Sequence, residues 1–395
     1  MPVTELSEDE RLARLRLWRS DGVGPAGFAM LLQRFGSAAA ALAALPRLAR
    51  TKPAFARLRV CPADEAEAEL AAMAERGWAF LHLAQADYPR LLGAIDDLPA
   101  VLGLRGDRAA LEQPAVALVG ARNASGNGRA FARRMAAELA VAGWTVVSGL
   151  ARGIDTAAHV GTLEAGGRTV AAVASGLDIV YPEENAPLVE RLVERGAVAS
   201  ERPLGAEPKA KHFPKRNRII AGLSLGVVVI EAAPQSGSLI TARLAATYGR
   251  EVMAVPGSPL DARHRGTNQL LRDGAALVES AADVLAVLEP LRERGPVALD
   301  APRVAAATTR TDRPRPRVVR RVTRDAPPLP AATPPPANGL AARLLERLGA
   351  EPIAVDELVR QCAASAAEVL ETLFELELDG RIERHPGQRV ALALG

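Results

Sequence analysis

Residues that build disulfide frameworks and metal sites are scarce in this sequence. Its 395 residues include only two cysteines, Cys61 and Cys362, and its five histidines show no HxxH or HxxxH spacing. A disulfide scaffold needs several cysteines, and a zinc site needs ligands at close and regular spacing. We therefore expect neither a disulfide framework nor a bound metal.

Long hydrophobic runs are also missing. A membrane-spanning helix needs roughly 18 or more consecutive apolar residues, and no segment reaches that length without interruption. The opening segment, MPVTELSEDERLARLRLW, is charged and contains no apolar signal core. These absences predict a cytoplasmic protein without a membrane span.

Aromatic residues make up only 3% of the sequence, whereas hydrophobic residues as a whole make up 49%. A chain of this length and composition can bury a sizeable core, and we expect it to form two or three domains. Because aromatic residues are so few, any that lies in a polar stretch is a candidate for a role outside the core.

Positive charge is unevenly distributed along the chain. The formal net charge is +3, but eight arginines and two aspartates between Ala301 and Asn338 give that segment a charge of +6. The remaining residues therefore sum to −3. Any site for a polyanion in the folded parts must be a local patch, because those parts are not uniformly basic.

The residue pattern divides the chain into four parts. Residues 1–74 have an all-helical pattern, and residues 75–295 alternate β-type runs with helical patterns. Residues 296–338 include nine prolines between Ala301 and Asn338, with many arginines among them, which predicts an extended linker. Residues 339–395 have the order of three helices followed by a β-hairpin, which is typical of a winged-helix domain.

Six apolar runs in the second part predict the strands of a sheet. Strands that alternate with helices favour a Rossmann-like α/β fold with a doubly wound, parallel sheet. Ligands of such sheets bind at the carboxyl ends of the strands. The runs span residues 115–120, 144–149, 169–175, 196–201, 225–232 and 251–257.

The two flanking domains leave alternatives open. The turn from Gly22 to Pro25 can present backbone N–H groups to a phosphate, but it also suits a purely structural helix pair, which we favour. In the last domain, the third predicted helix, SAAEVLETLFELELDG, holds several glutamates and neither lysine nor arginine. Insertion into a DNA groove needs cations, so we favour an interaction or structural module.

The first predicted strand leads into a glycine-rich turn, VGARNASGNGRAF, in which Gly120, Gly126 and Arg122 are candidate phosphate contacts. The spacing differs from the GxGxxG dinucleotide fingerprint, and the next strand ends without an acid to hold a ribose. A Walker A lysine is also missing. The sequence therefore predicts phosphate contact without NAD or any other cofactor.

The second strand leads into SGLARGIDTAAH, where Ser148, Gly149 and Arg152 are candidate DNA contacts. Ser148 with Asp155 and His159 offers the residue types of a hydrolytic triad. However, Asp155 and His159 lie four residues apart on a helix, which suits a structural pair. We favour the structural interpretation and expect no catalytic residue.

Within the α/β part, the densest positive charge follows the fourth strand, in EPKAKHFPKRNRIIAGLS. Between Glu207 and Arg218 there are five cations and one acid. Cations that contact phosphates beside a ring that stacks on a base are what single-stranded nucleic acid requires. A solvated basic loop with its ring in the core is the alternative, in which some of these residues are structural. The predicted contacts are Lys209, Lys211, Phe213, Lys215, Arg216, Asn217 and Arg218.

Another strand-to-helix turn, EAAPQSGSLITARLA, supplies Ser236, Gly237 and Ser238 as candidate backbone and hydroxyl contacts. A later polar loop adds Gly257 and Asn268 at the same sheet edge. Several loops with small residues suit a shallow groove better than a deep catalytic pocket.

The ordered segments VGAR, SGLARGIDTAAH, ASGLDIVYP, SERP, FPKRNRIIAGLS, EAAPQSGSLITARLA and VPG…GTNQLLRDGA resemble the DprA/Smf family of DNA-processing proteins. The resemblance covers about residues 87–278, and the helical first domain is similar to a SAM-like domain. It implies binding and protection of single-stranded DNA, loading of RecA recombinase during natural transformation, a homodimer formed through the Rossmann-like domain, and no enzymatic activity. By position, the family's pocket arginine falls on Arg122, its phenylalanine on Phe213, and its lysine on Lys209 or Lys211.

Two other functions remain to be weighed. A nucleotide phosphohydrolase of the lysine-decarboxylase-like Rossmann group is expected to carry PGGxGTxxE, and no glutamate stands at that spacing here, so an obvious base is missing. A transcription factor that reads duplex DNA through the winged-helix domain conflicts with the acidic third helix. We therefore favour a DNA-binding protein without catalytic activity.

Overall fold

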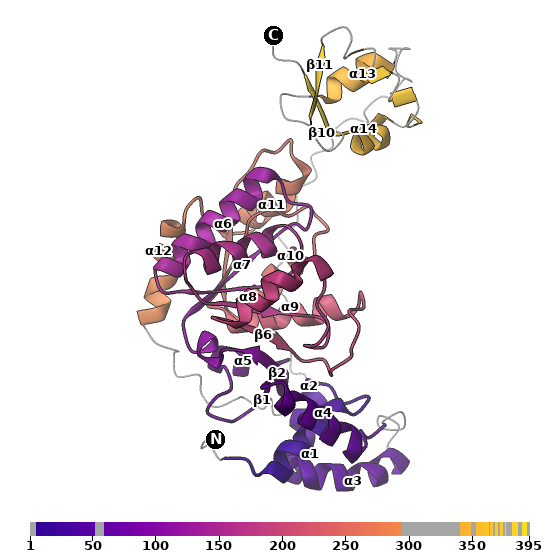
Figure 1. Ribbon diagram of the computed structural model, residues 1–395, viewed down its shortest axis with the longest axis vertical. Coiled ribbons are helices and arrows are strands. Elements are labelled where there is room, and N and C mark those ends of the chain that lie inside the picture. The colour runs from indigo at the N-terminus through magenta and orange to yellow at the C-terminus, as the bar shows by residue number, and fades with distance from the viewer. Residues whose placement is uncertain are drawn as a thin grey trace, which may run out of the picture. The chain divides into compact units, whose positions relative to one another are not determined.

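A computed structural model describes residues 5–51 and 59–293, and in the C-terminal part residues 340–348, 353–362, 364–365, 368–369, 372–373, 376, 381–385 and 389–392. The chain divides into two compact units, residues 1–310 and 311–395. The first unit contains both the helical pattern and the α/β pattern of the sequence (Figure 1). The predicted linker, 296–338, lies outside the described residues, and the four predicted domain boundaries stay predictions.

Four helices form the N-terminal part, which confirms its helical character: α1 (Glu8–Arg19), α2 (Pro25–Phe35), α3 (Ala38–Thr51) and α4 (Ala63–Glu75). Ser7 caps α1 by accepting a hydrogen bond from the Glu10 backbone N–H at 3.2 Å. Proline at the first position of α2 needs no backbone donor there. Leu17, Phe28 and Leu45 are completely or almost completely buried in the core of this helical part.

Nine strands form one sheet in the order β1-β2-β6-β5-β4-β3-β7-β8-β9. All neighbours from β6 to β9 pair in parallel, and this confirms the predicted Rossmann-like arrangement. Six of the strands match the six apolar runs. Their bounds are β3 (Ala115–Val119), β4 (Thr145–Ser148), β5 (Thr169–Ala172), β6 (Ala197–Ser200), β7 (Gly226–Val229) and β8 (Glu251–Ala254).

Three further strands were not predicted from the sequence. β1 (Ala79–His82) and β2 (Val101–Gly106) pair with each other, and β2 pairs with β6, in antiparallel orientation. At the opposite edge, β9 (Ala276–Leu277) adds a two-residue parallel strand beside β8. The antiparallel edge at β1 and β2 carries the chain from the N-terminal helices into the sheet.

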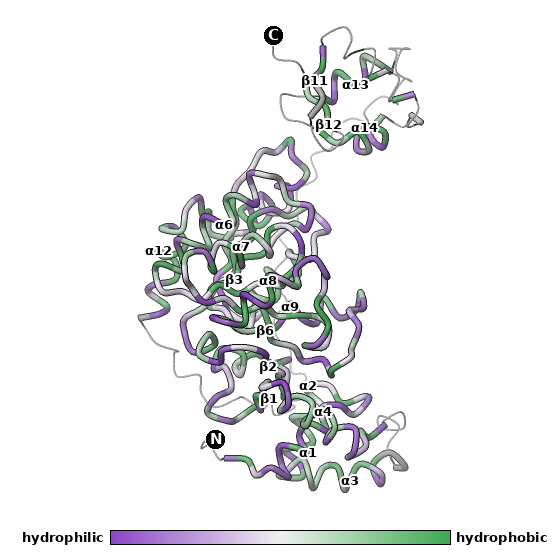
Figure 2. Tube along the Cα trace, viewed as in Figure 1, coloured by the Kyte–Doolittle hydropathy of each residue, from purple (hydrophilic) through white to green (hydrophobic). Residues whose placement is uncertain are grey.

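Helices cover both faces of the parallel sheet (Figure 1), and apolar residues concentrate where they pack (Figure 2). Alternate strand residues face opposite layers, because side chains of a strand point to its two faces in turn. Ala117 and Val119 pack with Ile219 of one layer, whereas Val116 and Leu118 pack with Met135 of the other. The helices are α5 (Arg90–Gly93), α6 (Gly126–Val141), α7 (Ile154–Glu164), α8 (Ala186–Val193), α9 (His212–Leu223), α10 (Ser238–Thr247), α11 (Arg265–Arg272) and α12 (Ala281–Glu293).

The second unit contains α13 (Leu340–Arg347), β10 (Ile353–Ala354), α14 (Val355–Cys362), β11 (Ile382–His385) and β12 (Arg389–Leu392). β11 and β12 pair in antiparallel orientation, which confirms the predicted hairpin, and β10 pairs with β12. The predicted third helix falls largely outside the described residues. Leu344, Leu358 and Val390 are fully buried in a separate small core.

Candidate nucleic-acid interface

The carboxyl edge of the sheet contains a topological switch point between β3 and β7. From β3 the chain proceeds through β4, β5 and β6 on one side, and later through β7, β8 and β9 on the other. In open α/β sheets the ligand crevice lies where the strand order reverses in this way. Eight of the sixteen predicted site residues lie in the loops that follow the strands at this edge, and the others lie in β4, α6, α9 and α10.

A carboxylate of the protein itself lies in the crevice. Glu231, which follows β7, is only 1% exposed and accepts hydrogen bonds from the backbone N–H (2.9 Å) and the hydroxyl (2.5 Å) of Ser125. Ser125 in turn caps α6 by accepting from the Gly128 N–H at 2.8 Å. A Cβ at Gly128 would lie 2.4 Å from the Glu231 carboxylate. The crevice therefore already holds an anion at the helix end where dinucleotide-binding folds place a pyrophosphate.

An exposed arginine and two aromatic rings form a cluster beside this crevice. The Arg122 guanidinium lies 4.8 Å from the centre of the Phe213 ring, a cation–π distance. The Tyr181 ring meets Phe213 edge-on, with 5.8 Å between ring centres. Phe213 is half-buried, Arg122 is exposed and Tyr181 is 47% exposed. We name Arg122, Tyr181 and Phe213 the ring cluster.

Tyr181 was not among the predicted site residues. The signal was present in the sequence, because Tyr181 is a rare aromatic residue in the polar stretch between Asp178 and Asn185. Its contact with Phe213 depends on the loop after β5 meeting the start of α9, which only the fold brings together.

Lysines adjoin the ring cluster at the start of α9. Lys209, Lys211 and Lys215 are all exposed. The whole chain contains four lysines, and the fourth is Lys52. Three of the four thus fall within seven residues, so the enrichment is specific to this loop and helix start and does not reflect general composition.

Two predicted phosphate contacts are instead buried and bonded internally. Arg216 donates to the carbonyl oxygens of Gly149 and Ala172, and burial lowers its pKa to about 10. Arg218 donates to the carbonyl oxygen of Asp97 and to the Glu201 carboxylate. We assign both arginines to the fold, because no part of a DNA strand can reach a guanidinium enclosed in this way.

Several other predicted contacts also serve the fold. The Ser148 hydroxyl is fully buried and donates to the Leu118 carbonyl oxygen at 2.6 Å, and the Asn217 amide donates to the Gly237 carbonyl oxygen at 3.2 Å. Gly120 packs against Ile154, and Gly149 packs against the Arg216 guanidinium, so closely that a Cβ at either would collide. These residues stabilise the packing under the loops at the carboxyl edge of the sheet.

The residues of the alternative triad do not assemble. The His159 imidazole pairs with the Thr169 hydroxyl at 2.7 Å, and Ser148 bonds to the backbone instead. Burial lowers the pKa of His159 to about 3. Asp155 is buried and accepts hydrogen bonds from the Gly149 and Ala151 N–H groups. This geometry favours the structural interpretation of the pair.

The remaining candidates lie in the segments that follow β3, β4 and β7. Arg152 is exposed and makes two hydrogen bonds, of 2.7 and 2.8 Å, to Glu184, which lowers the pKa of that carboxyl. In the segment after β7, the Ser236 and Ser238 hydroxyls pair with each other at 2.7 Å. Ser238 is buried, whereas Gly126 and Gly237 are exposed. A phosphate at Arg152 would have to compete with Glu184.

The described residues contain neither a metal-binding cluster nor a single helix that could span a membrane. No group of three or more histidine, cysteine or acidic residues there has the arrangement of a metal site. No single described helix is long and apolar enough to cross a membrane. The helices at 25–35 and 38–48 would qualify only as a pair bent by 103°.

Three family models match the chain in the order that the sequence predicted. The model described as DNA recombination-mediator protein A matches residues 79–289, which is more than half of the chain. A DprA-like N-terminal HHH domain matches residues 8–72, and a DprA winged helix domain matches residues 327–388. The helical first domain and the winged-helix domain are thereby confirmed.

Relatives and a solved structure agree with these models. Protein Smf from Synechocystis is 37% identical over 77% of this chain and 77% of its own length. Protein Smf from Escherichia coli is 38% identical over 79% of this chain and 77% of its own. The X-ray structure of DNA processing protein A from Streptococcus pneumoniae, 32% identical, covers 72% of this chain and 98% of its own with a TM-score of 0.57. The chain therefore belongs to the DprA/Smf family of DNA-processing proteins.

Proposed function

We propose that this protein binds single-stranded DNA at the ring cluster and the neighbouring lysines, and that it does so without catalysing a reaction. The observation that carries the proposal is an exposed guanidinium over an aromatic ring that has a second, half-exposed ring at its edge. Unpaired bases stack on such groups, and the bases of a duplex are not available to them. A DNA-processing role is also that of the family.

The phosphates would be held by exposed cations around the cluster. Arg122 lies over the ring, and Lys209, Lys211 and Lys215 flank it in sequence. Neutralising phosphates releases counterions, so the affinity should fall steeply as salt rises. Arg152 and the exposed backbone at Gly126 and Gly237 are further candidate contacts, whereas the buried arginines of α9 are not.

The closed crevice favours DNA over a free nucleotide. A nucleotide phosphate at the end of α6 would meet the Glu231 carboxylate, and two anions in one desolvated site repel each other. The buried position of His159, and its bond to Thr169, also leave no histidine base near Ser148. Both features support binding without hydrolysis.

We further propose that the protein protects the bound strand, acts as a homodimer through the sheet domain and passes the strand to RecA recombinase. These roles follow from the family resemblance. An apolar edge supports the dimer: Leu260, in the loop after β8, is 92% exposed, and Leu277, on the edge strand β9, is 54% exposed.

The DNA site can be tested by fluorescence anisotropy with a labelled oligothymidylate. We expect Arg122→Ala to weaken binding about 10- to 100-fold, since a hydrogen bond to a charged group is worth roughly 1.5–3 kcal/mol. Phe213→Ala should weaken it by a similar factor, because a base–aromatic stack contributes roughly 1–3 kcal/mol.

Arg168→Ala is the matched control for this experiment. Arg168 is an exposed arginine immediately before β5, at the amino edge of the parallel strands and therefore opposite the site. It should bind the oligonucleotide as the unmodified protein does. If Arg122→Ala and Phe213→Ala bind the oligonucleotide as tightly as Arg168→Ala does, the proposed site is refuted. Release of a base or phosphate from nucleoside monophosphates would refute the proposal that the protein has no catalytic activity.

A further inference from the structure

The segment that carries two of the proposed DNA-binding lysines is a long connection. β6 ends at Ser200 and α9 begins at His212, so residues 201–211 cross from the sheet edge to the helix without a helix or strand of their own. Its eleven residues make it longer than most connections in compact domains, whose median length is about 4–6 residues. We call residues 201–211 the lysine loop.

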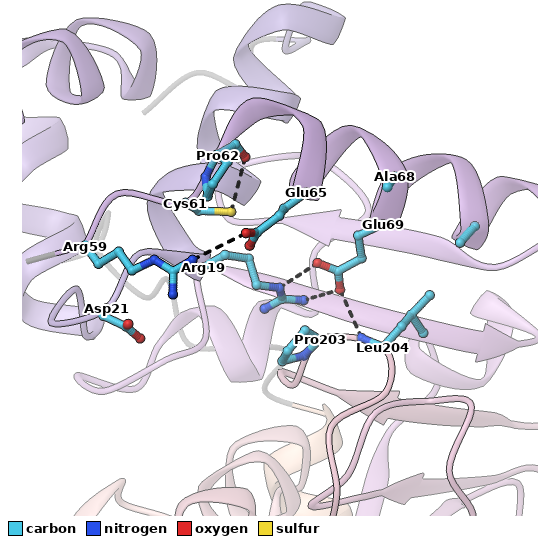
Figure 3. A pocket seen from close by; sticks show the side chains of 11 residues that line it. Arg19, Asp21, Arg59, Cys61, Pro62, Glu65, Ala68, Glu69, Pro203 and Leu204 are labelled. Atoms are coloured by element: carbon cyan, nitrogen blue, oxygen red, sulfur yellow. Dashed lines mark hydrogen bonds and ion pairs between the residues drawn. The ribbon is translucent and has the colours of Figure 1, made fainter.

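The N-terminal helices contact the beginning of this loop through one ion pair. Arg19 at the end of α1 donates two hydrogen bonds to Glu69 of α4, each 2.8 Å long, and both side chains are only 9% exposed. The same guanidinium donates to the Glu201 carbonyl oxygen at 2.9 Å, and Glu69 accepts from the Leu204 N–H at 3.3 Å. Figure 3 shows Arg19, Glu69 and Leu204 joined in this way.

The ion pair lines a cavity between the N-terminal helices and the lysine loop. Its volume is about 460 Å³, and its lining includes Arg19, residues of α4, and Pro203 and Leu204 of the loop. Leu204 also packs against an apolar cluster that includes Met73 of α4. The polar contacts of Arg19 and Glu69 therefore hold the loop on the side that faces the cavity, where atoms are not close-packed.

The beginning of the loop is in turn connected to the DNA site. The Glu201 side chain accepts from Arg218 of α9, the helix that carries Phe213. The Gly205 N–H donates to both carboxylate oxygens of Asp178, each at 2.9 Å, and Asp178 lies three residues before Tyr181. A shift of residues 201–205 would therefore also displace Phe213, Tyr181 and the rest of the lysine loop.

From these contacts we infer that Arg19 and Glu69 are positioning residues for DNA binding. Through these two residues the N-terminal helical part holds the lysine loop in the conformation that binds DNA, without itself contacting the DNA. The inference rests on the proposed function in one respect, because it presumes that the lysine loop meets DNA.

The test compares Arg19→Gln and Glu69→Gln with Arg14→Gln. Arg14 is a matched control, because it lies on the same helix but bonds elsewhere: it pairs with Glu10 at 3.1 Å and donates to the Leu83 carbonyl oxygen, not to the lysine loop. We expect the first two variants to bind a labelled oligothymidylate about threefold to thirtyfold more weakly, the range that a coupling through intervening contacts produces. Arg14→Gln should bind unchanged.

Two further readouts separate positioning from general destabilisation. Amide hydrogen exchange in residues 201–211 should accelerate in Arg19→Gln and Glu69→Gln and not in Arg14→Gln. The slope of log affinity against log salt should become shallower by about one phosphate contact for each lysine displaced. A structural role alone would leave that slope unchanged.

The inference is overturned if exchange in the lysine loop does not change, or if it accelerates while affinity equals that of Arg14→Gln. Global unfolding of both variants under conditions where Arg14→Gln stays folded would also overturn it, since the pair would then hold the whole domain. Failure of the unmodified protein to bind DNA would refute the proposed function instead, and hydrogen exchange would still decide whether the pair shapes the loop.

Discussion

Arg216 and Asp155 are oppositely charged and lie near each other beneath the ring cluster, without a direct ion pair between them. Each side chain is almost completely buried, and each bonds to the backbone around Gly149. Burial raises the pKa of Asp155, and the nearby Arg216 guanidinium opposes that rise. A buried pair adds little net stability, but loss of one partner leaves an uncompensated charge in a medium of low polarity.

Arg216→Met should therefore lower the free energy of unfolding by about 3–5 kcal/mol. Without the arginine, the pKa of Asp155 in the folded protein should rise further above its value in the unfolded chain. The folded state then holds the proton more tightly, so stability is lost as the pH rises through that pKa. Urea unfolding at several acidic and neutral pH values measures both effects.

Lys215→Met is the control at the residue scale, since Lys215 is exposed and surface substitutions change stability by about 0.5 kcal/mol or less. If Arg216→Met loses no more free energy of unfolding than Lys215→Met at any pH, the structural role of Arg216 is contradicted. The same two variants should reverse their order in DNA affinity per folded molecule, with Lys215→Met the weaker binder.

The difference between Lys215 and Arg216 could not be predicted from the sequence. Adjacent cations in a basic run look alike, but successive helical residues point about 100° apart, so one faces solvent and the next faces the sheet. Lys209, Lys211 and Phe213 were predicted as a group, because charge and aromatic character are local properties. The positions of Tyr181 and Glu231 in the site could not be predicted, because they depend on contacts between segments that are distant in the sequence.

At the scale of elements, Glu231 joins the strand β7 to the start of α6. Its carboxylate accepts both polar hydrogens of Ser125, the residue that caps that helix. Six parallel strands of the domain, β3 to β8, were predictable from apolar runs and their spacing. β1 and β2 were not, because β2 pairs with β6, nearly a hundred residues later, and short antiparallel edges leave no periodic signal.

Glu231→Ala should destabilise the protein by about 1–3 kcal/mol, the cost of leaving buried donors unsatisfied. Glu231→Gln should be less affected, because its amide oxygen can still accept one bond. Thermal unfolding measures the effect, with Glu183→Ala, an exposed acid before α8, as the control. Affinity for single-stranded DNA should stay within about twofold, and a large loss of binding without a loss of stability would place Glu231 in the DNA site instead.

At the scale of the whole molecule, the edge formed by β9 is the surface on which the proposed dimer depends. An edge strand presents unpaired backbone groups, and Leu260 and Leu277 add exposed apolar area beside it. A lysine at this edge would place a charge in the interface and oppose association.

Leu277→Lys should therefore shift the protein from dimer to monomer, as measured by size-exclusion chromatography with light scattering over a range of concentrations. Val141→Lys is the control, because Val141 is 79% exposed at the end of α6, on a different element. A monomeric Val141→Lys beside a dimeric Leu277→Lys would place the interface at the end of α6 instead of at β9.

Because lysine is so rare in the chain, a reagent that modifies amines can label the proposed interface selectively. Only four side chains in 395 residues carry a primary amine, and three of them adjoin the ring cluster. Amine-selective acylation would thus modify the three lysines of the DNA site, while the 45 arginines stay unmodified. Mass spectrometry of the labelled protein would report occupancy of the site, since a bound DNA strand shields those three amines.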